Sequence, residues 1–333
     1  MSSGMLSRFW VSSAFEGTAG IPATVDKSFY PKLVNINFKE DHSKNDEVTG
    51  FRNAVQETRE QVMAGGGIDH YIHPDWAAWL CKMLYGNSPA SALVAPSLTV
   101  FEHVYNTIAS TPKTFTVIKH SSDITNYTEK FCGNGITGIS IKSGKGRIML
   151  SAKVEGLGAN YEQGVSDPVA VFPITTADED PHLGVNSNLL IDGVSVTKGE
   201  LDANWSIDID FGARLLSTAG STDGSVTRFD LQEWNTLTAN FTLYESDVSN
   251  LADFLAGSYH TYAFQTIGQL IDVPNALKSL IEFKLTRARV VGEWKSEIGD
   301  HGVYKVPITI SGIVDTTTGY DLITRVRNLQ ASY

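Results

Sequence analysis

Two carboxylates, Asp208 and Asp210, stand two residues apart in a segment that alternates apolar and polar residues. At this spacing both side chains lie on the same face of a strand. A pair of carboxylates can hydrolyse glycosidic bonds, provided that the two groups flank a cleft. A solvated strand face is the more frequent explanation of such a pair, so Asp208 and Asp210 alone do not predict an enzyme.

Asp69, His70, His73 and Asp75 are of types that bind metal ions. The two histidines are three residues apart across an expected strand-to-helix junction, whereas paired histidine ligands on one helix are four apart. Pro74 also interrupts the segment. We therefore favour a helix start in which Asp75 caps the first turn, and we predict no metal site.

The string from Gly133 to Gly138 matches the pattern G-x-G-x-x-G. A dinucleotide site needs this pattern between a strand and a helix, but here a strand pattern follows, so we favour a glycine-bent start of a strand. The sequence contains neither a G-x-S-x-G motif nor a local Cys-His signature. We predict no catalytic residue, no cofactor and no enzymatic activity.

Composition limits the class of protein further. The 26 basic and 37 acidic residues give a net charge of −11, which argues against a protein that binds nucleic acid through its phosphates. The acidity is uneven, with −1 from Met1 to Thr175 (15 basic, 16 acidic) and −10 from Thr176 to Tyr333 (11 basic, 21 acidic). For Cys81 and Cys132, two buried thiols are favoured over a single disulfide. No stretch approaches the roughly 18 apolar residues of a membrane span, and we expect a soluble protein made in a cytoplasm.

The alternation of apolar and polar residues predicts a mainly β chain in which one order of elements occurs twice. The order is strand, long loop, strand, short helix, strand and long hairpin. In the first half the strands are expected at 33–39, 68–72, 115–119, 138–142 and 147–154, the loop at 41–61 and an amphipathic helix at 75–84. In the second half the strands are expected at 204–211, 237–244, 261–266, 280–291 and 302–314, the loop at 213–234 and the helix at 247–256. A proline-rich linker at 168–181 separates the halves, which predicts an N-terminal arm (1–31) with little core of its own, a first domain (32–175) and a second domain (176–333).

Several segments together resemble a known family. They are the arm Gly17–Ala23, the strand and helix Gly67–Leu80, the closing hairpin Cys132–Gly156, and the end Ile308–Val314 with Gly319–Tyr320. On these segments the chain resembles the tail tube proteins of long-tailed bacteriophages, in the version with two tube domains in one chain. The region Asn87–Ser110, of which 87–96 is expected to be a loop, departs from that pattern and looks like an insertion.

The resemblance implies a fold and a way of assembling. Each tube domain is expected to be a β-sandwich-like or barrel-like unit with a short flanking helix, and the inner sheets of a ring close into one barrel. Two domains per chain imply three chains in a ring with pseudo-sixfold symmetry, and six chains are the alternative if the second half is a decorating domain. Stacked rings form a hollow tube for genome passage in the virion tail. The implied partners are other copies of the chain, the tape-measure, tail terminator and distal tail proteins, and DNA that passes without specific binding; no membrane is involved.

The resemblance also assigns roles to particular residues. The long loops are expected to reach the neighbouring ring, and their candidate contact residues are Asp41, Asn45, Glu47, Arg52, Glu57, Arg59, Ser221, Asp223 and Arg228. Asp208 and Asp210 become candidates for charges that face the lumen, where an acidic lining repels phosphates. The alternative to a tube subunit is a β-sandwich module that binds carbohydrate or a receptor, which would need an exposed aromatic platform.

Overall fold

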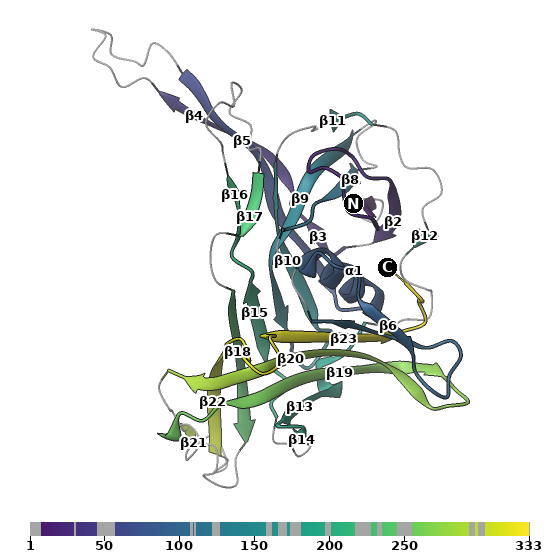
Figure 1. The fold of residues 1–333 in the computed structure, drawn as a ribbon, viewed down its shortest axis with the longest axis vertical. Helices are drawn as coiled ribbons and strands as arrows, with labels where there is room; N and C mark the ends of the chain where they lie inside the picture. Colours follow the sequence, from purple (N-terminus) through teal and green to yellow (C-terminus); the bar gives the residue numbers. More distant parts are fainter. Residues whose placement is uncertain are drawn as a thin grey trace, which may run out of the picture.

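The computed structural model shows a mainly β chain, and the described residues include one long helix, which lies near the middle of the molecule (Figure 1). It describes residues 8–29, 31–44, 57–106, 109, 111–121, 127–157, 162–165, 172–173, 181–196, 201–216, 228–231, 235–244, 255–292, 297–298 and 304–332.

A long antiparallel sheet runs through both halves of the chain. Its strands, in spatial order, are β5 (Glu57–Tyr71), β10 (Met149–Gly156), β9 (Tyr127–Lys142), β15 (Ser206–Asp210), β18 (Thr236–Tyr244) and β22 (Tyr304–Gly312). The short β3 (Leu33–Val34) and β4 (Asn37–Lys44) pair with the other side of β5. Apolar side chains alternate with polar ones along these strands, so one face of the sheet is buried and the other is open. We call the open side of these six strands the polar face.

Two smaller groups of strands cross behind this sheet and cover its apolar side (Figure 1). The first group continues from β9 through β8 (Phe115–Ser121), β1 (Arg8–Ser12), β2 (Val25–Phe29) and β12 (Phe172–Pro173), with β11 (Glu162–Gln163) beside β9. The second group continues from β22 through β20 (Leu277–Val291) to β19 (His260–Asp272), β13 (Ser187–Ile191) and β14 (Val194–Ser195). It also contains β23 (Leu322–Asn328), β7 (Phe101–Tyr105) and β6 (Ala90–Leu93), while β21 (Glu297–Ile298) pairs with β22 and η2 (Gly184–Asn186) precedes β13. The layers are those of a β-sandwich, and the sheet is not closed into a barrel.

The order of pairing is repeated in the two halves. In the first half it is β5–β10–β9–β8–β1, and in the second half it is β18–β22–β20–β19–β13. A single cluster of buried apolar side chains extends through both halves, from Phe9 to Val326. The repeat seen in the sequence therefore corresponds to a repeat of strand order, and the domain boundaries at 31 and 175 stay a prediction.

Helix α1 (Pro74–Tyr85) is buried on every side, although the spacing of its apolar residues predicts an amphipathic helix. Pro74 suits the first turn, and Gly86 ends the helix with φ 68°, a left-handed conformation that glycine adopts without strain. The predicted cap is wrong: His73 is the N-cap residue, and Asp75 instead accepts a hydrogen bond from the Asn328 side chain at 2.7 Å. Strands from both halves contact α1. The paired strands β23 and β7 cover the side of the helix that the amphipathic pattern predicts to be exposed to solvent.

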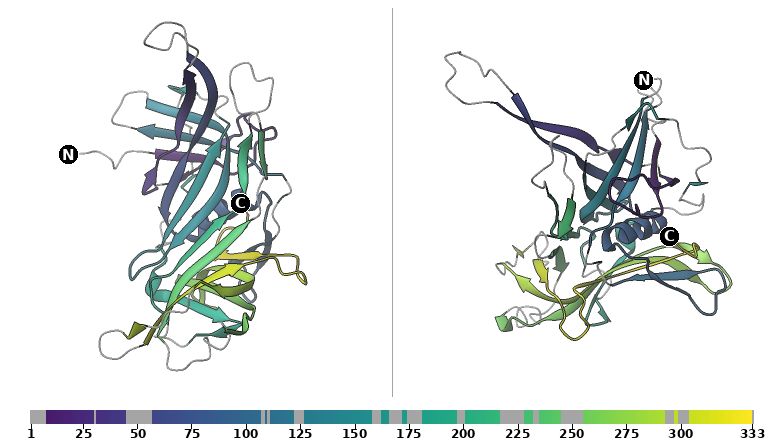
Figure 2. Two further views of the ribbon diagram at one scale, coloured as in Figure 1. Left: turned by 90° about the vertical axis from the view of Figure 1, so that its left-hand side faces the viewer. Right: turned by 45° about the horizontal axis from the view of Figure 1, so that its top comes forward.

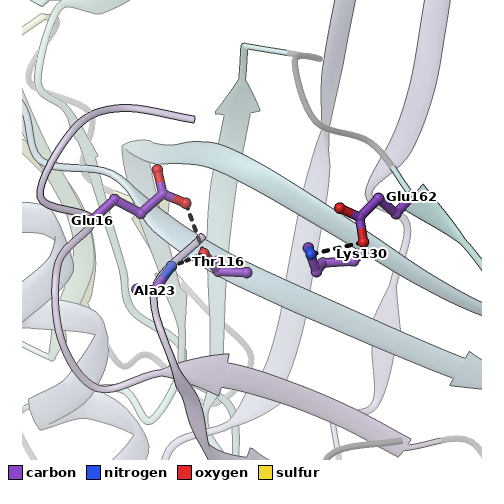
Figure 3. A network of polar contacts seen from close by, with 5 residues as sticks. All are labelled: Glu16, Ala23, Thr116, Lys130 and Glu162. Atoms are coloured by element: carbon purple, nitrogen blue, oxygen red, sulfur yellow. Dashed lines mark hydrogen bonds and ion pairs between the residues drawn. The ribbon is translucent and has the colours of Figure 1, made fainter. Parts of the chain in front are cut away.

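The N-terminal segment differs from the expected arm because β1 and β2 are paired strands, and Phe9, Trp10 and Val11 are buried. The carboxylate of Glu16 anchors the segment between them (Figure 3). It accepts hydrogen bonds from the Thr114 and Thr116 hydroxyl groups and from the backbone N–H groups of Gly20 and Gly133, all at 2.8–3.0 Å.

Three segments expected to be loops contain paired strands. At the two ends of the range 41–61, residues 41–44 belong to β4 and residues 57–61 to β5, and these paired strands project from the body (Figures 1 and 2); residues 45–56 lie outside the described residues. Within residues 213–234, β16 (Ala213–Leu216) pairs with β17 (Arg228–Leu231). Residues 90–93 form β6 in the expected insertion. Polar residues pair as well as apolar ones when a hairpin satisfies the backbone, which is why alternation of apolar residues does not reveal these strands. The expected helix at 247–256 lies mostly outside the described residues.

Candidate functional site

The polar face carries two of the predicted site residues, Asp208 and Asp210, beside polar residues from both halves of the chain. One row of facing residues crosses six strands, and its members are Asp69, Ser151, Ser140, Asp208, Thr238 and Ser311. All of them carry a hydroxyl or carboxylate group. In the neighbouring position on each strand the side chain points into the core, as for Ile139, Ile209 and Leu237, which are at most 3% exposed. The alternation of single residues thus separates a polar surface from an apolar core.

Asp208 and Asp210 lie on this face, as the spacing predicts, but they make different contacts. Asp208 is exposed, and its carboxylate accepts a hydrogen bond from the Ser140 hydroxyl group on β9 at 2.6 Å. Asp210 is half-buried and accepts a hydrogen bond from the backbone N–H of Gly212 at 2.8 Å. The first carboxylate therefore links two strands, whereas the second stabilises the turn after β15.

The charges of the described side chains on the six strands nearly balance across this face. They are the carboxylates of Asp69, Glu155, Asp208 and Asp210 and the ammonium groups of Lys142, Lys153 and Lys305. Lys153 forms an ion pair with Glu155 at 3.2 Å. Four carboxylates against three ammonium groups leave the described part of the face slightly acidic, and its lysines stand on three different strands instead of forming one basic cluster for a phosphate backbone.

Small residues let the strands approach closely in the middle of the face. A shallow hollow there is lined by Gly66, Gly67, Gly138, Ser140 and Asp208, among others. A Cβ atom added to Gly138 would lie 2.6 Å from the backbone oxygen of Ile209. Glycine is therefore required where β9 of the first half meets β15 of the second.

His182 joins the two halves behind this sheet. Its backbone bonds to Ile72 and Ile148 in the first half at 3.0 and 3.1 Å. Its ring nitrogens lie 2.8 Å from the Thr266 hydroxyl group and 3.0 Å from that of Ser279 in the second half. Burial lowers the pKa of His182 to about 4, with a smaller contribution from the nearby His73. The folded chain therefore holds the imidazole ring of His182 in its neutral form.

The candidate inter-ring residues that the structure describes lie in paired strands and not in loops. Asp41 lies in β4 opposite Gln61, and Glu57 and Arg59 lie in β5. Arg228 lies in β17 opposite Leu216. The other candidates, Asn45, Glu47, Arg52, Ser221 and Asp223, lie outside the described residues.

The glycine string and the residues of metal-binding types, which the sequence also offered as candidate sites, belong to β9 and to the junction of β5 with α1. Residues 133–138 lie inside β9, with Gly133 at φ 72°, so no helix follows the glycine string. Within the part of the chain that the structure describes, no three histidine, cysteine or acidic residues are grouped to hold a metal ion. None of the helices among those residues is long and apolar enough to cross a bilayer.

The thiols and the tryptophans are buried where the structure describes them. Cys81 and Cys132 are free thiols, and burial raises their pKa to about 12 and about 11. Trp76, Trp79 and Trp205 are at most 3% exposed and so form no platform for a sugar.

The sequence does not reveal the contribution of the first half to the polar face. Asp69, Ser140 and Ser151 are ordinary polar residues in alternating strands, and only the register of β5, β10 and β9 brings them into line with Asp208. The alternation around each residue is the one signal that could have indicated its side of the sheet.

Comparison with known proteins identifies the family. No curated protein matches the chain. A family model described as "Phage tail tube protein" matches residues 11–276, which is 266 of the 333 residues. The match begins near the end of β1 and includes β2, α1 and every strand of the polar face except β22. The chain therefore belongs to the phage tail tube protein family.

Proposed function

We propose that copies of this structural tail protein join into rings, that the rings stack into a hollow tube, and that the polar face lines its channel. The single observation that carries the proposal is the continuity of that face across both halves of the chain. A surface that stays polar over six strands, with the apolar core directly behind it, suits the wall of a water-filled channel.

The chemistry of the polar face favours passage of DNA without binding. Affinity for DNA comes mainly from basic groups that neutralise phosphates, and each such contact slows sliding. The face carries more carboxylates than ammonium groups, and Lys153 is already paired with Glu155. Asp208 and Asp210 add repulsion at the junction of the two halves. The physical role of the face is to leave the genome mobile.

The two hairpins are the parts that we assign to contacts between rings. The β4–β5 hairpin carries Asp41, Glu57 and Arg59, and the shorter β16–β17 hairpin carries Arg228. The first projects well beyond the body of the chain (Figure 1), as a connector to a neighbouring ring must. The repeated strand order supports two tube domains per chain and hence three chains per ring. The chain is made in the host cytoplasm and has no enzymatic activity; tape-measure, terminator and distal tail proteins complete the tail.

Thiol labelling of assembled tubes tests which face lines the channel. Both native cysteines are buried, so a cysteine introduced by Asp208→Cys reports its own accessibility. Leu98→Cys is the control, because Leu98 is 84% exposed near the tip of the β6–β7 hairpin, which lies away from the polar face (Figure 1). In the dispersed chain both cysteines should react with a bulky maleimide at similar rates. In long tubes the Asp208→Cys thiol should react at least about tenfold more slowly, since reagent enters only at the ends; equal rates in tubes would contradict the proposal.

A further inference from the structure

The pairing of β9 with β15 shows how one half of the chain attaches to the other. It is antiparallel and runs from Lys142 opposite Ser206 to Gly138 opposite Asp210. Because the two halves repeat one strand order, this internal contact can serve as a template for a contact between two chains. The inference rests on the proposed assembly into rings.

An irregularity shared by the two halves fixes the equivalence of individual residues. In the first half, β9 has one residue more than β8 between the pairs Phe115–Asn134 and Val117–Phe131. In the second half, β20 has one residue more than β19 between the pairs His260–Ala288 and Tyr262–Leu285. Asn134 and Ala288 are therefore equivalent. Gly156 faces Asn134 and Gly312 faces Ala288, so these two glycines are equivalent as well.

From the two glycines the equivalence extends to the outer edges of the sheet. Gly156 is paired with Ala64, which is paired in turn with Phe38. Gly312 is paired with Leu237, which is paired in turn with Ile209, so Phe38 and Ile209 are equivalent. One residue further along, Lys39 is equivalent to Asp210. Three residues before each glycine, Lys153 faces Gly138 and Thr309 faces Val291, so Val291 is equivalent to Gly138.

Both equivalent edges lie at the ends of the repeated array. Among the described residues, β15 is paired on both sides, whereas β3 and β4 are paired with β5 alone. In the same part of the chain, the pairing of β19 with β20 ends at His260 opposite Ala288, so no described strand pairs with that side of β20 at Val291. At the first edge the Lys119 ammonium donates to the carbonyl oxygen of Ile36 at 3.0 Å. A lysine is a common way to protect a sheet edge before it finds its partner.

We propose that the edge of β4 in one copy pairs antiparallel with the edge of β20 in the next copy, with Lys39 opposite Val291. This register repeats the internal pair of Asp210 and Gly138. The contact is head-to-tail, and repeating it generates the proposed ring when the rotation between successive copies closes. β20 lacks the extra residue that β9 carries beside Gly138, so the strand stays regular and accommodates a valine.

Disulfide formation in assembled tubes tests the register. The variant Lys39→Cys/Val291→Cys places two thiols at facing positions, where Cα atoms are about 5 Å apart and a disulfide forms readily. The matched control is Asn35→Cys/Val291→Cys, which moves one thiol four residues along the same exposed edge, about 13 Å away. The buried native thiols, with pKa values raised to about 12 and about 11, should not react. Mild oxidation and non-reducing electrophoresis then measure covalent linkage between chains.

The facing pair should link the copies of a ring into covalent multimers that thiol reductant separates, at least tenfold more efficiently than the offset pair. Tubes in which the offset pair links equally well, or in which neither pair links, overturn the register but leave the tube function standing. A chain that forms no rings overturns both. If the variants fail to assemble, a density map of the unaltered tube decides: Lys39 and Val291 of neighbouring copies within about 6 Å support the register, and a separation beyond about 8 Å refutes it.

Discussion

Acidification should weaken the joint between the two halves through His182. The folded chain holds this ring neutral with a pKa of about 4, whereas an unfolded chain has the ordinary value of about 6.5. Because the folded-state pKa is lowered, the unfolded state binds more protons between these values. The stabilisation is thus complete above about pH 6.5 and is lost as the pH falls toward 4.

The size of the effect follows from the two pKa values. Between pH 7 and pH 5 the loss in the free energy of unfolding from this one group is about 2 kcal/mol, and the full loss by pH 4 approaches about 3 kcal/mol. Protonation would also make both ring nitrogens donors, although hydroxyl groups of Thr266 and Ser279 can rotate to accept.

Urea unfolding of the dispersed chain at several pH values measures this loss, with His182→Gln as the comparison. Glutamine can bond to the same hydroxyl groups but does not titrate, so its lower overall stability should depend less on pH. Between pH 7 and pH 5 the variant should lose about 2 kcal/mol less than the unaltered chain. An identical loss in both proteins would refute the assignment of the acid sensitivity to His182.

Three further substitutions test the fold and the polar face. Glu16→Ala should lower the free energy of unfolding, measured by heat or urea, by about 3 kcal/mol, because it leaves buried donors without an acceptor. The control Glu162→Ala removes only an exposed ion pair with Lys130 at 2.8 Å and should lower it by less than about 1 kcal/mol (Figure 3). Gly138→Val should lower the free energy of unfolding by more than about 3 kcal/mol, because its Cβ would meet the backbone of β15. The control Gly146→Ala, whose Cβ would have no atom within 4 Å, should change it by no more than about 0.5 kcal/mol. Equal losses in the two variants would contradict the close approach of β9 and β15. Asp208→Lys should fold and assemble, but tubes carrying it should retain DNA and release it more slowly at low salt, and an unchanged release rate would argue against a lumenal position.

Part of the fold could be predicted from local patterns. The alternating segments at 204–211 and 237–244 appear as β15 and β18, because each pattern reflects a strand with one buried side. The helix at 75–84 appears as α1, although it is buried on every side. The hairpin at 143–146 also connects its two strands as its glycines indicate. The strands β4, β6 and β23 were missed or shortened, since their partners are distant in sequence or their residues are polar.

The candidate site was predicted only in its second half. The spacing of Asp208 and Asp210 placed both on one open strand face, and that is where they lie. Their companions Asp69, Ser140 and Ser151 could not be selected, because nothing local distinguishes them from other polar residues on strands. A different error affected α1, where Asp75 was predicted to cap the first turn and is instead buried, with its carboxylate accepting a hydrogen bond from the Asn328 side chain.

The sequence by itself determined a mainly β chain, acidic in its second half, with one order of elements used twice. These properties depend on composition and on short-range periodicity, which a chain carries before it folds. The sequence also carries segments that resemble the tail tube proteins, and that resemblance predicted the family. The tertiary structure alone decided that the two halves share one sheet, which residues face one another across it, and which edges remain for a neighbour. Register arises from the packing of whole strands, and a shift of a single residue would exchange the polar face for the core.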